Sequence, residues 1–442
     1  MDAFIKNFIK SFLNKFFILF LSLIASVIVA RALGPEGKGV FTIAISFSAF
    51  IIVLANLGMT DPICYYTSRD EFPKKIMFGN SVLFSLIAGF VSVVLGLVFI
   101  LLFSGAFFPG IESEYLVFSL CFMPFLLLIP NLNSILLGKK DISTYNLSLL
   151  LQGILYLSFI SFLLLYKISV FSALAGSAIS FFVTSSALFM ILLKGSGGID
   201  IKPDINYFRK CLPFGIKSHI SSILAFFVLR FPMFMVNYYL GTLSTGIFSV
   251  SLVLAQQVEL LPYTMSLMLF PSISGEKDEE RRRELTPFVF RTVLFLLSIC
   301  IIFLMVVSKP LISLLYSDRF LDSIFPFQIL LPGILFVSIW RVFTTDFSAR
   351  GKPEYTLFIN IVMAFLCLLL NSILIPWLGI IGASLAFSTS FCISGVLSLV
   401  LYKKITKLTF RELFFPNRLD RSVCEDLVNR YVLRKKSPYN SI

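Results

Sequence analysis

Six polar or charged side chains lie inside or at the ends of long apolar stretches, where such groups most need a partner. They are Arg31, Arg230, Gln256, Gln257, Glu259 and Arg341. If the stretches cross a bilayer, an ionised side chain there costs about 2.5–3.5 kcal/mol or more unless it meets water, a partner or a ligand. Arginine offers a fixed fork of donors that matches a phosphate and keeps its proton. The arginines therefore predict a site for an anionic group.

Arg230 is the residue on which this prediction chiefly depends. Pro232, two residues further on, lacks a backbone donor and disturbs a helix, which suits a segment that bends. A contact with a substrate is one interpretation of Arg230. The other is a structural pair with Glu259, Gln256 or Gln257 in the next apolar stretch, because buried arginines also serve purely structural pairs. A resting pair that opens for the ligand would satisfy both interpretations.

The other ionisable groups have simpler interpretations. Arg31 ends the first apolar stretch, where it either reaches the interface or contacts a substrate. Arg341 and Asp346 are five residues apart and do not share a helix face, so we do not pair them. We expect Asp346 to be hydrated and Arg291 to reach the interface. His219, the only histidine, is interpreted as an interfacial polar residue rather than a proton relay.

The stretches that carry these residues have the length and composition of transmembrane helices. The chain is 57% hydrophobic and 14% charged, whereas a soluble protein has about 25% charged residues. A helix needs about 20 apolar residues to cross the hydrocarbon core, and uninterrupted hydrophobicity excludes the alternating pattern of a membrane barrel. We therefore expect an all-α membrane protein with twelve transmembrane helices, near residues 12–31, 40–60, 77–103, 115–137, 145–166, 171–193, 214–238, 246–271, 287–308, 325–347, 354–376 and 380–402.

Basic residues predict the direction of these helices. With the N-terminus inside, only five basic residues fall in outer loops, namely Arg31, Lys38, Lys167, Lys309 and Arg319. This bias predicts a multi-pass protein of the cytoplasmic (inner) membrane with both termini cytoplasmic. The net charge of +13 lies largely in the inner loops and a basic tail, a distribution that suits anionic lipid headgroups and not nucleic acid.

The chain also contains a weak internal repeat. Leu33-Gly34 is followed after four residues by GVFT, and Leu240-Gly241, 207 residues later, is followed after four residues by GIFS. Each half would then hold six spans, so the halves would share one orientation about an axis along the membrane normal. We expect an N-terminal six-helix lobe over 1–198, a C-terminal six-helix lobe over 199–402 and a cytoplasmic basic tail over 403–442.

Motifs for enzyme chemistry, a cofactor or a metal do not occur in the sequence. The pattern GxxxxGK[ST] is missing, so ATP cannot be hydrolysed by that route, and the seven cysteines form no CxxC pair. The expected outer loops are short for the catalytic carboxylates of a membrane glycosyltransferase, polymerase or ligase. We expect a transporter that needs no cofactor and is not an enzyme.

The opening motif ARALGPEGKGV at residues 30–40, with NLGM at residues 56–59, resembles the start of bacterial polysaccharide-unit flippases. LLG at 136–138 with Asn146, the stretch 241–271 ending in MLFP, and IPWLGIIGA at 375–383 support the resemblance, which extends over about residues 10–402. One departure is that Arg230 is followed by Phe231-Pro232-Met233, without the acidic residue that members often carry there.

The resemblance implies the multidrug/oligosaccharidyl-lipid/polysaccharide exporter (MOP) fold, with two six-helix lobes around a V-shaped cavity. It implies a flippase that moves polyprenyl-diphosphate-linked oligosaccharides from the cytoplasmic to the outer leaflet by alternating access, for O-antigen (lipopolysaccharide), capsule or exopolysaccharide. Polysaccharide polymerase and chain-length proteins are candidate partners, beside membrane lipids. A multidrug exporter of the same fold would favour acidic residues in its cavity, and a lipid II-type flippase usually has two further spans.

Overall fold

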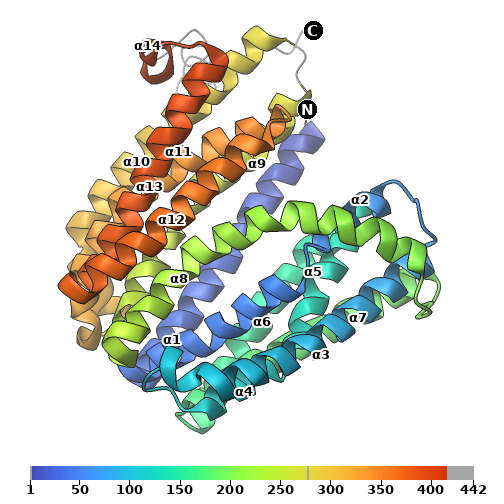
Figure 1. Ribbon diagram of the computed structural model, residues 1–442, viewed down its shortest axis with the longest axis horizontal. Coiled ribbons are helices and arrows are strands. Elements are labelled where there is room, and N and C mark those ends of the chain that lie inside the picture. The colour runs from blue at the N-terminus through green and yellow to red at the C-terminus, as the bar shows by residue number, and fades with distance from the viewer. Residues whose placement is uncertain (1, 276–277, 416–442) are drawn as a thin grey trace. The chain divides into compact units, whose positions relative to one another are not determined.

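The computed structural model describes residues 2–275 and 278–415, and every element in these ranges is helical (Figure 1). In chain order the elements are α1 (Asp2–Ala55), α2 (Thr60–Ser68), α3 (Lys74–Phe107), α4 (Ser113–Leu120), α5 (Met123–Gly138), α6 (Ile142–Tyr166), α7 (Val170–Ser196), α8 (Ile205–Gln257), α9 (Leu260–Gly275), α10 (Glu279–Tyr316), the 3₁₀ helix η1 (Asp318–Ser323), α11 (Ile324–Ala349), α12 (Pro353–Leu378), α13 (Ile380–Thr406) and α14 (Phe410–Phe414). The all-α class predicted from the sequence is confirmed.

Ten segments of the described residues are long and apolar enough to cross a membrane, whereas the sequence predicts twelve. The first expected pair of spans lies within the 43-residue segment Leu13–Ala55. Such a helix is about 65 Å long, roughly twice the thickness of the hydrocarbon core. The segment bends at Gly34, whose φ of 69° is a conformation that glycine adopts readily. α8 bends in the same way at Gly241, whose φ is 79°. This single bent helix contains the seventh expected span and the start of the eighth.

The repeated motif has the same local structure at both positions. Beyond the two bends, α1 and α8 cross so closely that a Cβ atom on Gly39 would lie 1.9 Å from the carbonyl oxygen of Thr242. A Cβ atom on Gly246 would likewise lie 1.8 Å from the carbonyl oxygen of Pro35. The two contacts correspond to each other, because Gly39 and Gly246 are 207 residues apart and so are Pro35 and Thr242. Glycine at both positions therefore lets the two backbones touch.

The chain divides into two compact units, each with its own core. The first comprises residues 1–254, 308–327 and 364–386, and the second comprises 255–307, 328–363 and the described residues from 387 onward. In the first unit α6 packs against α7 and α3 against α5 (Figure 1). Its core includes Phe78 and Leu132, and the core of the second includes Phe290 and Phe343. The expected lobes 1–198 and 199–402 have other bounds and stay a prediction.

Apolar side chains cover much of the helix surface, while small polar side chains join helices inside. Leu165 is 86% exposed and Leu101 is 83% exposed, which is stable only against lipid or another apolar surface. Inside the first unit, the Asn131 amide donates to Ser85 Oγ over 2.9 Å, and Ser48 Oγ donates to Ser119 Oγ over 2.8 Å. This arrangement is typical of packed transmembrane helices.

Candidate functional site

Arg230 lies on α8 in a segment rich in phenylalanine. Phe226 and Phe234 are four residues before and after it, so the three side chains share one face of the helix. The sequence predicts a disturbance at Pro232, but α8 continues through this proline and leaves helical geometry only at Gly241. The structure therefore holds Arg230 on a continuous helix, eleven residues before the bend at Gly241.

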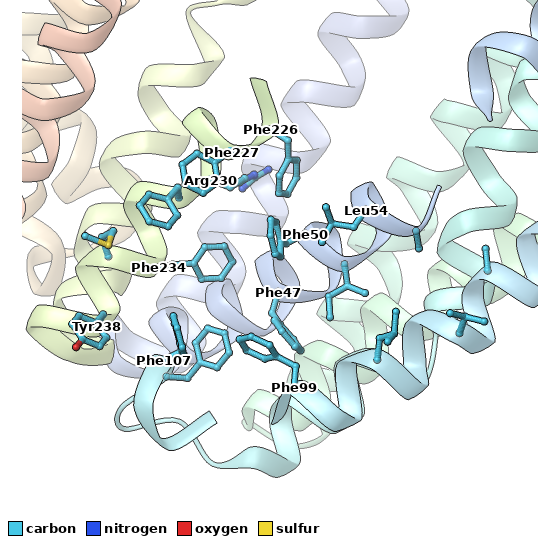
Figure 2. A pocket seen from close by; sticks show the side chains of 18 of the residues that line it. Phe47, Phe50, Leu54, Phe99, Phe107, Phe226, Phe227, Arg230, Phe234 and Tyr238 are labelled. Carbon is cyan, nitrogen blue, oxygen red and sulfur yellow. The ribbon is translucent and has the colours of Figure 1, made fainter. Parts of the chain in front are cut away.

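A cavity of about 890 Å³ opens beside Arg230, lined chiefly by α1, α3 and α8 (Figure 2). This volume is within the range of about 300–1,000 Å³ that ligand pockets occupy. All 23 described residues that line the cavity belong to the first compact unit. Ten of them are phenylalanine, two are tyrosine, and Arg230 carries the only charge among them. The site thus combines a wide apolar lining with one fixed positive charge.

Ring contacts tie the walls of this cavity together. Phe50 of α1 stacks on Phe226 with ring centroids 6.3 Å apart and meets Phe234 edge-on at 6.4 Å. Phe108, just after α3, lies 5.3 Å from Phe47 and 6.0 Å from Phe234. Such contacts contribute about 0.5–1.5 kcal/mol each beyond the area they bury. The aromatic lining is therefore a connected framework.

The guanidinium of Arg230 has no salt bridge and no hydrogen bond with any residue that the structure describes. Among the described residues, its electrostatic neighbour is the Tyr156 hydroxyl. A phenol does not neutralise an arginine, which stays charged under all ordinary conditions. The unpaired charge in an apolar cavity needs water or an anion. Chemically, the site can hold an anionic group whose remainder is apolar.

Glu259 pairs with Arg341 inside the second compact unit. Arg341 Nη2 lies 2.6 Å from Glu259 Oε2, with side chains 22% and 13% exposed. The guanidinium also lies over the rings of Tyr263 and Trp340, at 5.6 and 5.7 Å from their centroids. Glu259 Oε1 and Arg341 Nε are buried without a hydrogen-bond partner, so the pair does not use all its capacity. The carboxylate proposed as a structural partner for Arg230 is thus engaged by a different arginine.

The remaining predicted site residues lie at the end of α8 and just before the bend of α1. Gln256 and Gln257 end α8, and the Gln256 carbonyl accepts a hydrogen bond from the Glu259 amide over 3.1 Å. Arg31 is exposed, and its Nε donates to the Leu315 carbonyl over 2.7 Å at the end of α10. Its Nη2 also donates to the carbonyl of the preceding residue. Arg31 therefore satisfies free carbonyls of a helix C-terminus, and it belongs to the first unit together with Arg230.

One charged residue that the sequence assigns to an outer loop is buried instead. Lys38 is 4% exposed and donates from Nζ to Ser26 Oγ over 3.1 Å. The Tyr316 hydroxyl lies 3.3 Å from the same Ser26 oxygen. The loop interpretation is wrong because α1 continues past Gly34 as a helix and turns Lys38 inward. The following Gly39, which packs against Thr242, could have indicated a packed helix.

Two further expectations for charged residues are wrong. Asp346 is fully buried instead of hydrated, and it accepts hydrogen bonds from Arg350 Nε over 2.5 Å and from Thr286 Oγ1 over 2.6 Å. The spacing of four residues between Asp346 and Arg350 could have predicted this pair. Arg291 does not reach the interface but is 9% exposed and donates to the Glu412 carbonyl over 2.8 Å. It thereby fastens α14 to α10 within the second unit.

In residues 2–275 and 278–415, no group of three or more His, Cys, Asp or Glu side chains is arranged so that it could hold a metal ion. Six cysteines of this part of the chain are free thiols. Glu259 and Asp346 are each engaged by an arginine.

Comparisons with known proteins agree with this picture. The protein named "Putative O-antigen transporter" in Shigella flexneri is 22% identical over 391 residues, which cover 85% of this chain and 92% of the relative. The inward closed conformation of the lipid II flippase MurJ superposes with a TM-score of 0.75 at 19% identity, over 96% of this chain and 93% of that one. An inward-facing multidrug resistance MATE family transporter of the MOP superfamily gives a TM-score of 0.73 at 16% identity, over 88% and 94% of the two chains.

The two structural likenesses show the fold, which is that of MOP-superfamily transporters. The sequence profile of the family described as "Polysaccharide biosynthesis protein" matches residues 28–325, which is well over half of the chain. This multi-pass membrane protein therefore belongs to the polysaccharide biosynthesis protein family.

Proposed function

We propose that this transporter is a flippase that moves polyprenyl-diphosphate-linked oligosaccharide units from the cytoplasmic to the outer leaflet for surface polysaccharide synthesis. The observation that carries the proposal is the unpaired Arg230 in its aromatic cavity. A diphosphate between a lipid and a sugar is a compact anion next to an apolar chain. Arg230 offers that anion a bidentate partner, and the cavity offers the chain a dry environment.

The transport cycle that we propose is alternating access. The chain crosses the membrane twelve times, since each bent segment, through Gly34 or Gly241, makes two crossings. Two six-helix lobes, over 1–198 and 199–402, rock so that the headgroup site opens to one side of the membrane at a time. ATP is not the driving force, because the sequence has no nucleotide-binding loop. An ion gradient, the membrane potential or consumption of the product outside would drive the movement.

Further contacts for the headgroup come from the other predicted site residues. Arg341 becomes available when it separates from Glu259, and the atoms of this pair that lack partners favour such an exchange. Gln256 and Gln257 lie beside the break after α8 and offer amide donors to sugar hydroxyls. Arg31 is a contact for the anion near the outer end of the path.

The cellular setting follows from the same proposal. The protein lies in the cytoplasmic (inner) membrane with both termini and the basic tail from residue 403 in the cytoplasm. Its partners are the lipid-linked oligosaccharide, membrane lipids, and the polymerase and chain-length proteins that act on the translocated unit. The relative named for O-antigen transport supports this setting.

Two other cargoes fit the fold, and the charge of the site argues against one of them. A multidrug exporter, as in the MATE family transporter, would need a carboxylate to attract cationic drugs. The only charge among the described residues that line this cavity is positive. Lipid II, which the name of the MurJ relative gives as its cargo, also carries a diphosphate and would satisfy Arg230. Adding lipid II as a competitor in a translocation assay therefore distinguishes the two lipid-linked cargoes.

The proposal is tested by reconstituting the purified protein in liposomes and measuring the translocation of a polyprenyl-diphosphate-linked oligosaccharide between leaflets. We expect wild-type protein to exceed protein-free liposomes and Arg230→Ala to lose most of that rate. The translocation rate of Arg230→Lys should lie between those of wild type and Arg230→Ala, because lysine keeps the positive charge but not the paired donors of the guanidinium. A wild-type rate equal to that of protein-free liposomes would contradict the flippase assignment, and full activity of Arg230→Ala would remove this residue from the mechanism.

A further inference from the structure

We propose that the aromatic cavity binds the isoprenoid segment that directly follows the diphosphate, so that this site recognises the carrier lipid and not the sugar. The inference rests on the proposed function and refines it, because it assigns a binding site to the lipid end of the substrate. The alternative in which the whole prenyl chain remains in the surrounding bilayer needs no such cavity.

The composition of the cavity excludes an oligosaccharide as its occupant. Its 23 described lining residues include no Asn, Gln, Asp, Glu, Ser or Thr side chain. A sugar presents many hydroxyl groups, and each hydroxyl buried without a partner costs about 1–3 kcal/mol. Two tyrosine hydroxyls, of Tyr238 and Tyr239, and the guanidinium of Arg230 could satisfy only a few of them. An apolar ligand with one anionic end fits the lining instead.

The order of the side chains matches the order of groups in a prenyl diphosphate. Figure 2 shows the Arg230 guanidinium between Phe226 and Phe227, with Phe50 and Phe234 beyond them and further aromatic rings continuing away from the charge. An anion held at Arg230 would therefore place the first isoprene units against Phe50 and Phe234, whose rings touch each other. The limited volume of the cavity leaves the rest of the long carrier chain outside.

The rigid aromatic walls favour an isoprenoid over a straight acyl chain. Phe50 stacks on Phe226 and meets Phe234 edge-on, so ring faces and ring edges alternate along this wall of the cavity. A methyl-branched, partly unsaturated chain makes more contacts with such an uneven wall than an unbranched chain does, and each missing contact forfeits dispersion energy. Phospholipids, whose phosphate would also suit Arg230, should therefore bind less well.

The test measures binding to the full-length protein in nanodiscs of zwitterionic lipid by isothermal titration calorimetry. The probes are farnesyl diphosphate, a straight-chain alkyl diphosphate of the same carbon number, inorganic pyrophosphate and phosphatidylglycerol. We expect farnesyl diphosphate to bind at least about tenfold more tightly than the straight-chain diphosphate and pyrophosphate. Equal affinities for the branched and straight chains, or effective competition by phosphatidylglycerol, would overturn the proposal and indicate a general lipid pocket.

Variants separate this inference from the proposed function. Phe50→Leu and Phe234→Leu keep an apolar side chain of similar size, so both variants should fold. We expect each to lower the affinity for farnesyl diphosphate about tenfold and to leave the affinity for pyrophosphate unchanged. The control is Phe90→Leu on α3, a side chain that is 68% exposed and does not line the cavity. It should bind like wild type.

The Arg230→Gln variant shows whether a negative result refutes the lipid site alone or the headgroup site as well. If Arg230→Gln abolishes pyrophosphate and farnesyl diphosphate binding equally while the Phe variants bind like wild type, the lipid site is refuted and the headgroup site stands. If Arg230→Gln binds every diphosphate like wild type, both the headgroup site and the lipid site that depends on it are refuted.

Discussion

Replacing Asp346 with leucine tests whether the buried charges of the second unit act as one coupled pair. The carboxylate is fully buried between Arg350 and Thr286, and the Arg350 side chain is only 7% exposed. Removing one member of a buried pair typically costs about 3–5 kcal/mol, because the other charge remains buried. The second contact of Arg350, with Glu279, involves a carboxylate that is 52% exposed and compensates little. We therefore expect Asp346→Leu to lose stability in this range.

The double variant Asp346→Leu/Arg350→Met provides the decisive comparison. It removes both charges and fills their space with apolar side chains, a change that is often neutral or stabilising. We expect its loss of stability to be smaller than that of either single variant. The difference between the double loss and the sum of the single losses measures the coupling directly.

The assay is denaturant titration in detergent micelles, followed by the fluorescence of Trp340 on α11. The matched control is Glu36→Gln, which changes an exposed carboxylate and should stay within about 0.5 kcal/mol of wild type. A loss below about 1 kcal/mol for Asp346→Leu, or a double variant whose loss equals the sum of the single losses, would refute this reasoning.

Three further predictions concern backbone packing, a helix cap and the C-terminal clamp. Gly39→Ala places a Cβ atom 1.9 Å from the Thr242 carbonyl oxygen and should lower the free energy of unfolding by about 3 kcal/mol or more in the same titration. The control Gly105→Ala, whose Cβ would have no atom within 4 Å, should be neutral or stabilising. Equal losses of stability in the two variants would contradict the close crossing. Hydrogen bonds from the start of α6 hold the pKa of Asp141 below its usual range, so Asp141→Ala should cost about 1 kcal/mol at pH 7. Because the folded pKa is the lower one, this difference should persist above the ordinary pKa and vanish as the pH falls through the lowered value; a pH-independent difference would argue against the carboxylate. Arg291→Gln removes the guanidinium that donates hydrogen bonds to α14 carbonyls. Amide hydrogen exchange in α14 should therefore quicken at least about tenfold, which corresponds to a loss of about 1.4 kcal/mol. Unchanged exchange would show that α14 does not depend on Arg291.

Much of the fold could be predicted because the membrane restricts the possibilities so strongly. Apolar runs of about 20 residues must be helical in hydrocarbon, and every secondary-structure element of the described residues is helical. The number of continuous spans could not be predicted as well. Gly34 and Gly241 replace loops with bends inside long helices, and a hydropathy pattern does not distinguish a bend from a short loop.

The candidate site was only partly accessible from sequence. Arg230 could be selected because an ion is costly in an apolar stretch, whatever surrounds it. Its cavity could not be predicted, since the lining comes from α1, α3 and α8, which lie far apart in sequence. The partner of Glu259 was also out of reach, because Arg341 is 82 residues away. Local spacing identifies pairs on one helix, such as Asp346 with Arg350, but not pairs between helices.

The central claim is that Arg230 receives the charge of the lipid headgroup, and a comparison of two substrates tests it most directly. Initial rates of leaflet translocation are measured for one glycolipid carrying a diphosphate and for the same glycolipid with an uncharged linker, by wild type and by Arg230→Gln. We predict that wild type prefers the diphosphate and that Arg230→Gln reduces this preference at least about tenfold, as expected for one lost charged hydrogen bond of about 1.5–3 kcal/mol. The same preference in both proteins would contradict the account.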